Sequence, residues 1–156
     1  MIVIGIDPGL ATVGFGVLRK EEKTITPVSY GCIRTSAEKH TSERLVEIYN
    51  EINALFEKYS PEAVAVERLF FNKNVTNAMS VSEARGVIFL AVQQKNIPVF
   101  EYTPNQIKQA ITGSGRADKR QMQEMIKRLL NLDEVPRPDD AADGLSIALC
   151  HINIMR

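Results

Sequence analysis

The first third of the chain is predicted to form three β-strands. Residues 2–7 begin with a continuous apolar run, which is typical of a buried strand. Two further strands are expected over residues 14–18 and 26–34, with a charged turn at 21–23 between them. Because the connections between the three strands are short, neighbouring strands should be antiparallel.

Helical spacing dominates the rest of the chain. Apolar residues between Leu45 and Tyr59 recur on one helical face and predict a helix of about twenty residues, which Ser60-Pro61 should end. Two more strands and four more helices are expected; the strands cover 62–67 and 97–102, and the helices cover 77–95, 104–111, 117–131 and 139–154. The inward residues of the 117–131 helix should be Met122, Met125, Ile126 and Leu129.

This order of elements predicts the fold class. A meander of strands followed by strand–helix alternation indicates an α/β fold with a mixed five-stranded sheet flanked by helices. No repeat or linker interrupts the pattern, so residues 1–156 are expected to form one domain.

Composition excludes several classes of protein. The chain is 44% hydrophobic and 24% charged, which is ordinary for a soluble globular protein. No apolar run approaches the ~18 residues of a membrane span, and no basic region of a signal peptide precedes the first strand. Cys32 and Cys150 are isolated, which favours a reducing cytoplasm over a disulfide or zinc site.

Charge is unevenly distributed although the formal net charge is zero. Residues 105–130 hold six basic and two acidic residues, whereas residues 38–62 hold three basic and six acidic residues. The basic segment could be a footprint for nucleic acid. The alternative is a pair of solvated helix faces.

Four carboxylates stand out against this background. Asp7 and Glu67 each end an apolar strand, and Asp140 and Asp143 lie three residues apart at the start of a predicted helix. Charged side chains are rarely buried without a partner. Four converging acids would repel one another, and two hard cations such as Mg²⁺ or Mn²⁺ would relieve that repulsion. Paired metals of this kind promote in-line phosphodiester hydrolysis.

Each acid also has a simpler explanation. Asp7 could be a turn residue of Asp-Pro-Gly, and Glu67 could pair with Arg68 or Lys73. The two helix acids could serve only the helix dipole. Asp143 is the exception, because it lies a turn inward among small and apolar neighbours that predict close packing near the core.

Further candidates surround the acids in sequence. Phe70 and Phe71 follow Glu67, and one of them is expected in the core while the other could stack on a base. Arg116, Lys119 and Arg120 flank a glycine-rich loop that enters a helix, where phosphate is favoured.

Taken together, several short motifs resemble the RuvC family of Holliday-junction resolvases, in order and spacing over nearly the whole chain. The motifs are Ile4 to Gly9, Ala65 to Glu67, Ala84 to Gly86, Pro104 to Gln109 and Asp140 to Asp143. The resemblance implies a ribonuclease-H-like fold and a homodimer acting on four-way junction DNA. It also implies two divalent ions per site, Mg²⁺ with Mn²⁺ as a substitute, and a branch-migration helicase as a partner.

The resemblance also assigns roles to residues. Asp7, Glu67, Asp140 and Asp143 would be the catalytic metal ligands, although some family members have His at the position of Asp140. Phe70 would enter the junction. Two basic residues, Lys108 and Lys119, would lie near the DNA.

The resulting hypothesis is a cytoplasmic, metal-dependent endonuclease that nicks four-way junctions. Two alternatives are a phosphotransferase of the actin and sugar-kinase type and a non-catalytic junction-binding protein. The first needs a second nucleotide-binding domain, for which 156 residues leave no room, and four acids argue against the second.

Assembly can also be predicted from the second long helix. Residues 87–92 are apolar all round, whereas a helix that covers one sheet face needs only an apolar stripe. The surplus face is therefore expected at a two-fold dimer interface. The alternative is that it lies under the final helix inside a monomer.

Overall fold

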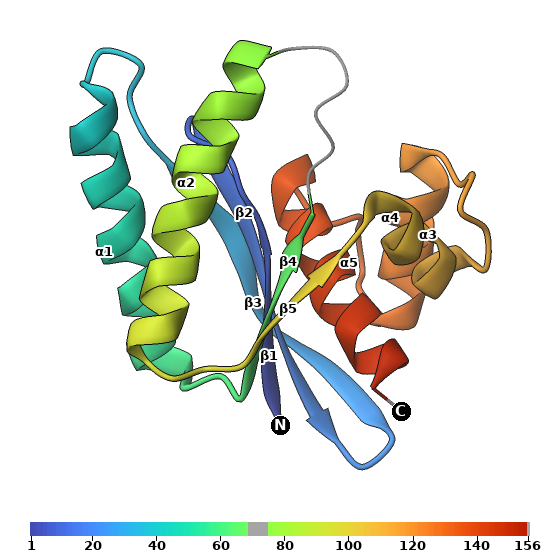
Figure 1. Cartoon of the computed structure of the whole chain (residues 1–156). Helices are drawn as coiled ribbons and strands as arrows, with labels where there is room; N and C mark the ends of the chain where they lie inside the picture. Colours follow the sequence, from blue (N-terminus) through green and yellow to red (C-terminus); the bar gives the residue numbers. More distant parts are fainter. Residues whose placement is uncertain (69–74, 156) are drawn as a thin grey trace.

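A mixed five-stranded sheet forms the centre of the molecule (Figure 1). The computed structural model describes residues 1–68 and 75–155. The strand order is β3-β2-β1-β4-β5. The strands are β1 (Ile2–Asp7), β2 (Thr12–Glu21), β3 (Thr24–Arg34), β4 (Ala63–Glu67) and β5 (Val99–Tyr102). The predicted α/β fold class is confirmed.

The direction of the strands follows from their connections. β1, β2 and β3 are joined by short turns and pair antiparallel, as predicted. β4 pairs parallel with β1, and β5 pairs parallel with β4. Parallel pairs need crossovers, and α1 (Thr41–Tyr59) and α2 (Val75–Gln94) supply them.

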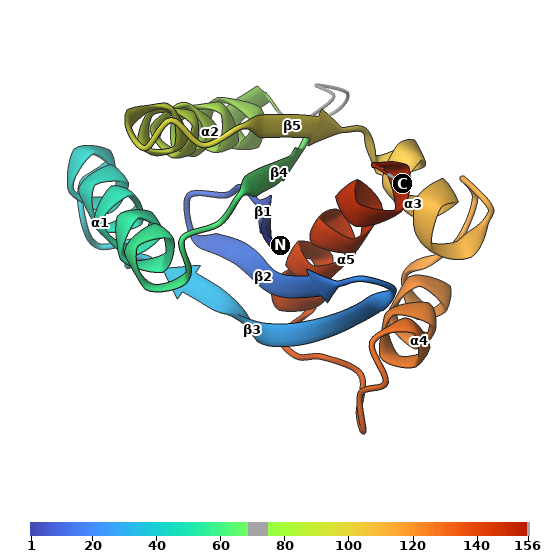
Figure 2. The same ribbon diagram turned by 90° about the horizontal axis from the view of Figure 1, so that it is seen from below.

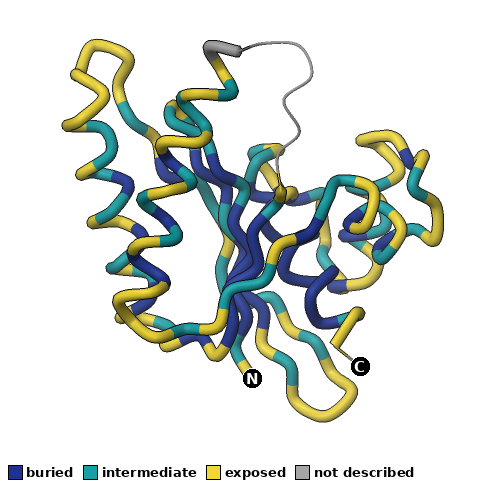
Figure 3. Tube along the Cα trace, viewed as in Figure 1, coloured by how far each residue is buried: buried dark blue, intermediate teal, exposed yellow. Residues whose placement is uncertain are grey.

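Helices cover both faces of the sheet (Figure 2). α1 and α2 lie on one face, and α3 (Pro104–Thr112), α4 (Lys119–Leu129) and α5 (Asp139–Ile154) lie on the other. Each face has its own apolar cluster, centred on Ile48 and Ile88 on one side and on Ile126 and Leu149 on the other. Figure 3 shows buried residues concentrated along the strands and α5.

α5 packs against the sheet through glycine. A Cβ atom added at Gly144 of α5 would lie 2.4 Å from the carbonyl carbon of Phe15 in β2. One added at Gly14 of β2 would lie 1.9 Å from the carbonyl oxygen of Asp140. Only residues without a side chain permit this approach of backbone to backbone. The first turns of α5 are therefore held directly beside the end of β1.

Local sequence explains where the helices begin and end. α1 ends at Ser60, which adopts a left-handed conformation with φ 45°, so the predicted stop is confirmed. α3 and α4 both start with a capping box, Thr103 with Gln106 and Asp118 with Gln121. Because Asp118 is the N-cap, α4 starts two residues later than predicted.

One predicted core position in α4 is wrong. Leu129 is 46% exposed, while Leu130, which follows α4, is only 3% exposed. Leu130 lies four residues after Ile126, and Ile126 lies four residues after Met122. The inward stripe of α4 therefore reaches Leu130 and leaves Leu129 facing outward. Met122, Met125 and Ile126 do pack into the cluster between α4 and α5.

α2 does not lie under the final helix, so that alternative is wrong. α2 packs beside α1, on the sheet face opposite α5 (Figures 1 and 2). Ile88, Ala91 and Val92 are buried there, while Leu90 is 53% exposed. Val87 and Phe89 also pack against this cluster, so Leu90 is the apolar side chain of residues 87–92 that remains exposed in the described chain. Among the described residues, no helix has the length and apolarity to cross a membrane.

Candidate active site

Asp7 and Glu67 are brought together by the parallel pairing of β1 and β4. Ile6 lies opposite Val66 in this pair, so the two acids occupy the same carboxyl edge of the sheet on adjacent strands. Both side chains are half-buried. Each follows a run of buried apolar residues that anchors its strand, which is why the strand ends are fixed in position.

Asp140 and Asp143 reach the same point from α5. Carboxylate oxygens of Asp7, Asp140 and Asp143 all lie within 4.8 Å of one another. The expectation that Asp143 packs close to the core needs correction. Its neighbours Ala142 and Gly144 are buried against the sheet, but Asp143 itself is exposed and faces the other acids.

The crowding of these carboxylates changes their protonation. Burial, followed by the charges of Glu67 and Asp143, raises the pKa of Asp7 to about 9. Burial likewise raises the pKa of Glu67. The pKa of Asp143 is also raised, because protein atoms around its carboxyl group displace water although part of the residue is exposed. Without a counter-ion, the site therefore favours a retained proton over full ionisation.

A divalent cation fits the donor set of this site. The ligands are carboxylate oxygens from three elements, and oxygen ligands suit Mg²⁺ or Mn²⁺ rather than a soft metal. Positive charge at this point would lower the pKa of Asp7, because it would favour the ionised carboxylate against both the burial and the repulsion from the other acids. Asp7, Asp140 and Asp143 could hold one ion directly, with Glu67 on the β4 side.

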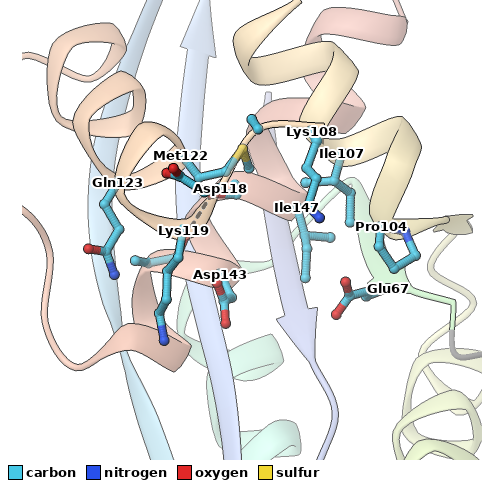
Figure 4. Close-up of a pocket in the computed structure, with 13 residues that line it drawn as sticks. Glu67, Pro104, Ile107, Lys108, Asp118, Lys119, Met122, Gln123, Asp143 and Ile147 are labelled. Carbon is cyan, nitrogen blue, oxygen red and sulfur yellow. Dashed lines mark hydrogen bonds between the residues drawn. The ribbon is translucent and has the colours of Figure 1, made fainter. Parts of the chain in front are cut away.

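A pocket of about 300 Å³ opens beside the acids (Figure 4). Glu67 and Asp143 line it together with Lys108 from α3 and Lys119 from α4. Lys119 Nζ lies 2.6 Å from Asp139 Oδ2 at the surface. The pocket thus joins carboxylates to two ammonium groups, a combination that can accept a metal-bound phosphate.

The other predicted residues lie elsewhere. Arg116 is exposed and lines two separate depressions with residues of α3 and α4. Arg120 is exposed on the first turn of α4. Phe70, Phe71 and Lys73 lie outside the described residues. Arg68, an alternative partner of Glu67, instead contacts Glu101.

The contacts of two residues, Arg85 and Asp139, were not foreseen from the sequence. Arg85 of α2 donates a hydrogen bond of 2.7 Å to the main-chain oxygen of Glu67. Asp139 holds Lys119 and also accepts a hydrogen bond from Gln123. The triplet Ala84-Arg85-Gly86 was one of the motifs, but the sequence carries no indication that its arginine contacts a backbone carbonyl.

A family model described as crossover junction endodeoxyribonuclease RuvC matches residues 3–151 of the chain. The chain belongs to the RuvC family. A curated family protein of Desulfitobacterium hafniense is 52% identical over 151 residues, which cover 97% of this chain and 92% of the relative. The relative from Thermotoga maritima is also 52% identical, over 149 residues that cover 96% of this chain and 89% of the relative. Both carry the family name as a crossover junction endodeoxyribonuclease.

Solved structures agree with this assignment. A structure described as Thermus thermophilus RuvC in complex with Holliday junction substrate is 36% identical, with a TM-score of 0.95 and coverage of 100% of this chain and 95% of that one. The yeast mitochondrial Holliday junction resolvase Ydc2 has a TM-score of 0.69 at 14% identity, covering 97% of this chain and 78% of that one, and so shares the fold. The predicted resemblance to the family is confirmed.

Proposed function

We propose that this chain is a metal-dependent, structure-selective endonuclease that resolves four-way DNA junctions by paired symmetric nicks. The products would be 5′-phosphate and 3′-hydroxyl ends. The observation that carries the proposal is the convergence of carboxylate oxygens of Asp7, Asp140 and Asp143 within 4.8 Å, with Glu67 at the end of the adjacent strand, near enough to raise the pKa of Asp7. Membership of the RuvC family supports the choice of substrate.

The four acids are proposed to hold two Mg²⁺ ions, for which Mn²⁺ can substitute. When bound, the ions supply an activated water and stabilise the charge on the leaving oxygen. Asp7 must give up its retained proton to act as a ligand, and a carboxylate at this edge can then accept a proton from the attacking water. Lys119, which lines the pocket beside Asp143, would stabilise developing negative charge on the phosphate.

DNA contacts are proposed on the α3–α4 side of the acids. Lys108 and Lys119 line the pocket with Glu67 and Asp143, so these two lysines would contact the scissile phosphate. Arg116 and Arg120, exposed further along this side, would contact more distant phosphates. Phe70, three residues beyond Glu67, is proposed to stack in the junction.

The active assembly is proposed to be a homodimer of single-domain subunits, each covering residues 1–156 and carrying one active site. The exposed apolar residues of α2 support this arrangement. Two sites related by a two-fold axis suit a near-symmetric junction that must be cut in opposed strands. We also propose a cytoplasmic location and a branch-migration helicase as a partner.

A labelled four-way junction tests the proposed function. The purified chain is titrated with Mg²⁺ in the presence of this junction and, separately, of a linear duplex with the same arm sequence. The expected result is paired nicking of the junction alone, and none by Asp143→Asn. Binding of the junction without cleavage at any concentration of Mg²⁺ or Mn²⁺ would instead support the non-catalytic alternative.

A further inference from the structure

Arg85 connects the long helix α2 to the strand end that carries Glu67. Its Nη1 donates a hydrogen bond of 2.7 Å to the main-chain oxygen of Glu67, the last residue of β4. That oxygen belongs to the peptide plane that follows Glu67. A fixed peptide plane holds the Cα of Glu67 in one position and orientation at the end of the strand, and the side chain projects from that Cα.

The guanidinium of Arg85 is itself held on several sides. Its Nη2 forms an ion pair with Glu101 of β5, and its Cζ lies 4.8 Å from the ring centroid of Phe89. The side chain is only 16% exposed. A largely buried arginine with these partners has few alternative positions, so it is a rigid support for the carbonyl that it contacts.

Arg68, which directly follows Glu67, is a second arginine near Glu101 but is less firmly held than Arg85. Its guanidinium contacts the same Glu101 at 3.4 Å, but its side chain is 55% exposed. Its main-chain N–H continues the β4–β5 ladder by donating to Tyr102. The two arginines therefore share an ionic partner, while Arg85 makes the side-chain contact to the Glu67 carbonyl.

We propose that Arg85 is a positioning residue that holds the Glu67 carboxylate in the geometry required for metal binding, through the backbone of β4. This inference rests on the proposed function, because it assumes that Glu67 is a metal ligand. Residues that orient metal ligands typically account for a 10- to 100-fold effect on metal affinity. Arg85 acts from the helix proposed as the dimer interface, so it also links that helix to the acids.

Direct binding of Mn²⁺ to the full chain tests the proposal without DNA or turnover. The free Mn²⁺ signal is followed by electron paramagnetic resonance for the wild type, Arg85→Met, Arg85→Lys and Glu101→Gln. Arg68→Met is the matched control, since it also removes one positive charge and one contact to Glu101. Melting temperature is recorded for every variant.

Arg85→Met is expected to weaken Mn²⁺ binding by about 10- to 100-fold. Arg85→Lys should weaken it less than Arg85→Met does, because an ammonium can keep one of the two contacts, although it cannot reproduce both as the planar guanidinium does. Glu101→Gln should have a small effect in the same direction, and Arg68→Met should bind Mn²⁺ as the wild type does. In cleavage assays, Arg85→Lys should raise the metal concentration for half-maximal nicking more than it lowers the rate at saturating metal.

Two results would overturn the proposal. Wild-type Mn²⁺ affinity in Arg85→Lys and Arg85→Met, with a lowered melting temperature, would make Arg85 a packing residue only. Equal losses in Arg68→Met and Arg85→Met would assign the effect to the contact with Glu101 that both arginines make, and not to the Glu67 carbonyl. If Arg85→Met does not fold, the Mn²⁺ affinities and melting temperatures of Arg85→Lys and Glu101→Gln test the proposal in its place. If the wild type binds Mn²⁺ with this dependence on Arg85 yet cuts no junction, the positioning role stands and the proposed function fails.

Discussion

The backbone of Asp140 rests on Gly14, so a residue with no side chain sets the position of a candidate metal ligand. A Cβ at Gly14 would lie 1.9 Å from the Asp140 carbonyl oxygen and 2.9 Å from its Cβ. Backbone atoms on both sides leave no flexible side chain that could move away. The close contact between β2 and α5 is thus part of the geometry of the active site.

Gly14→Ala should therefore displace the first turn of α5. We expect a loss of about 1–3 kcal/mol in the free energy of unfolding, which is typical of overpacking. Cleavage should fall although no charged group is lost. Gly115→Ala is the control, because a Cβ there would come no closer than 3.9 Å to another residue. Chemical denaturation and junction cleavage measure both effects, and equal stability of the two variants would refute this account of the α5 contact.

The four acids can be tested by isosteric neutralisation. Asp7→Asn, Glu67→Gln, Asp140→Asn and Asp143→Asn should each abolish cleavage, since each removes a charged oxygen ligand. Junction binding, which depends on phosphate contacts elsewhere, should be largely retained. Gel-shift assays in Ca²⁺ and cleavage assays in Mg²⁺ separate the two properties. A variant that cuts at close to the wild-type rate would remove its residue from the proposed site.

The raised pKa of Asp7 predicts how stability depends on pH in the absence of metal. The ordinary pKa is 3.8, and the folded protein raises it to about 9. Between these values the folded state binds more protons than the unfolded state, so the free energy of unfolding should fall as pH rises from about 4 to about 9. Denaturant unfolding in EDTA measures this slope.

Asp7→Asn provides the control for that slope. The amide does not ionise, so the decline with pH should become shallower and the variant should exceed the wild type in stability at pH 8. Mg²⁺ should also release protons as it binds, increasingly so at lower pH. A wild-type stability that rises between pH 5 and pH 8 in EDTA would contradict the raised pKa.

Sequence patterns correctly predicted those features of the fold and site that depend on local sequence. The apolar runs before Asp7 and Glu67 predicted both strand ends, and the three-residue spacing predicted that Asp140 and Asp143 share a helix face. The pattern failed at Leu129, because spacings of three and of four residues both fit a helix face, and the buried face of α4 continues from Ile126 to Leu130. The contact of Arg85 with a main-chain oxygen could not be predicted, because every residue except proline offers the same backbone groups.

Lys108 and Lys119 lie beside the candidate metal ligands, whereas Arg116 lies further away. The two lysines line the pocket that contains Glu67 and Asp143, whereas Arg116 lines other depressions. Lys108→Ala and Lys119→Ala should weaken junction binding and also lower the rate of cleavage at saturating protein. Arg116→Ala should weaken binding alone.

Salt titrations of binding complete this comparison. Each lost phosphate contact should reduce the slope of log affinity against log salt by up to ~0.9. Unchanged slopes in all three variants would mean that the basic residues of α3 and α4 form only a solvated surface. Asp139→Asn should have the opposite effect on affinity, because Lys119 loses its present partner and becomes available to phosphate.

The exposed side of α2 predicts the oligomeric state. Met79 is 61% exposed and Leu90 is 53% exposed, and exposed Gly86 lies between them at helical spacing. The small Gly86 beside Leu90 allows close approach of a second helix, and exposed Glu83 lies on the same side, one turn after Met79. A two-fold dimer that pairs α2 with its copy would bury this stripe in a self-complementary contact. The wild type should therefore sediment as a dimer at micromolar concentration.

Leu90→Glu should convert this dimer to a monomer, because two carboxylates would be placed in an apolar contact without partners. Val46→Glu is the matched control: Val46 lies on α1 and is 57% exposed, so the same charge enters a comparably exposed apolar site. That variant should remain dimeric. On a junction held in a small supercoiled plasmid, Leu90→Glu should yield mainly singly nicked circles, whereas the wild type and Val46→Glu yield linear products. A wild type that sediments as a monomer with and without junction DNA would exclude the dimer, and loss of dimer in both variants would place the interface outside α2.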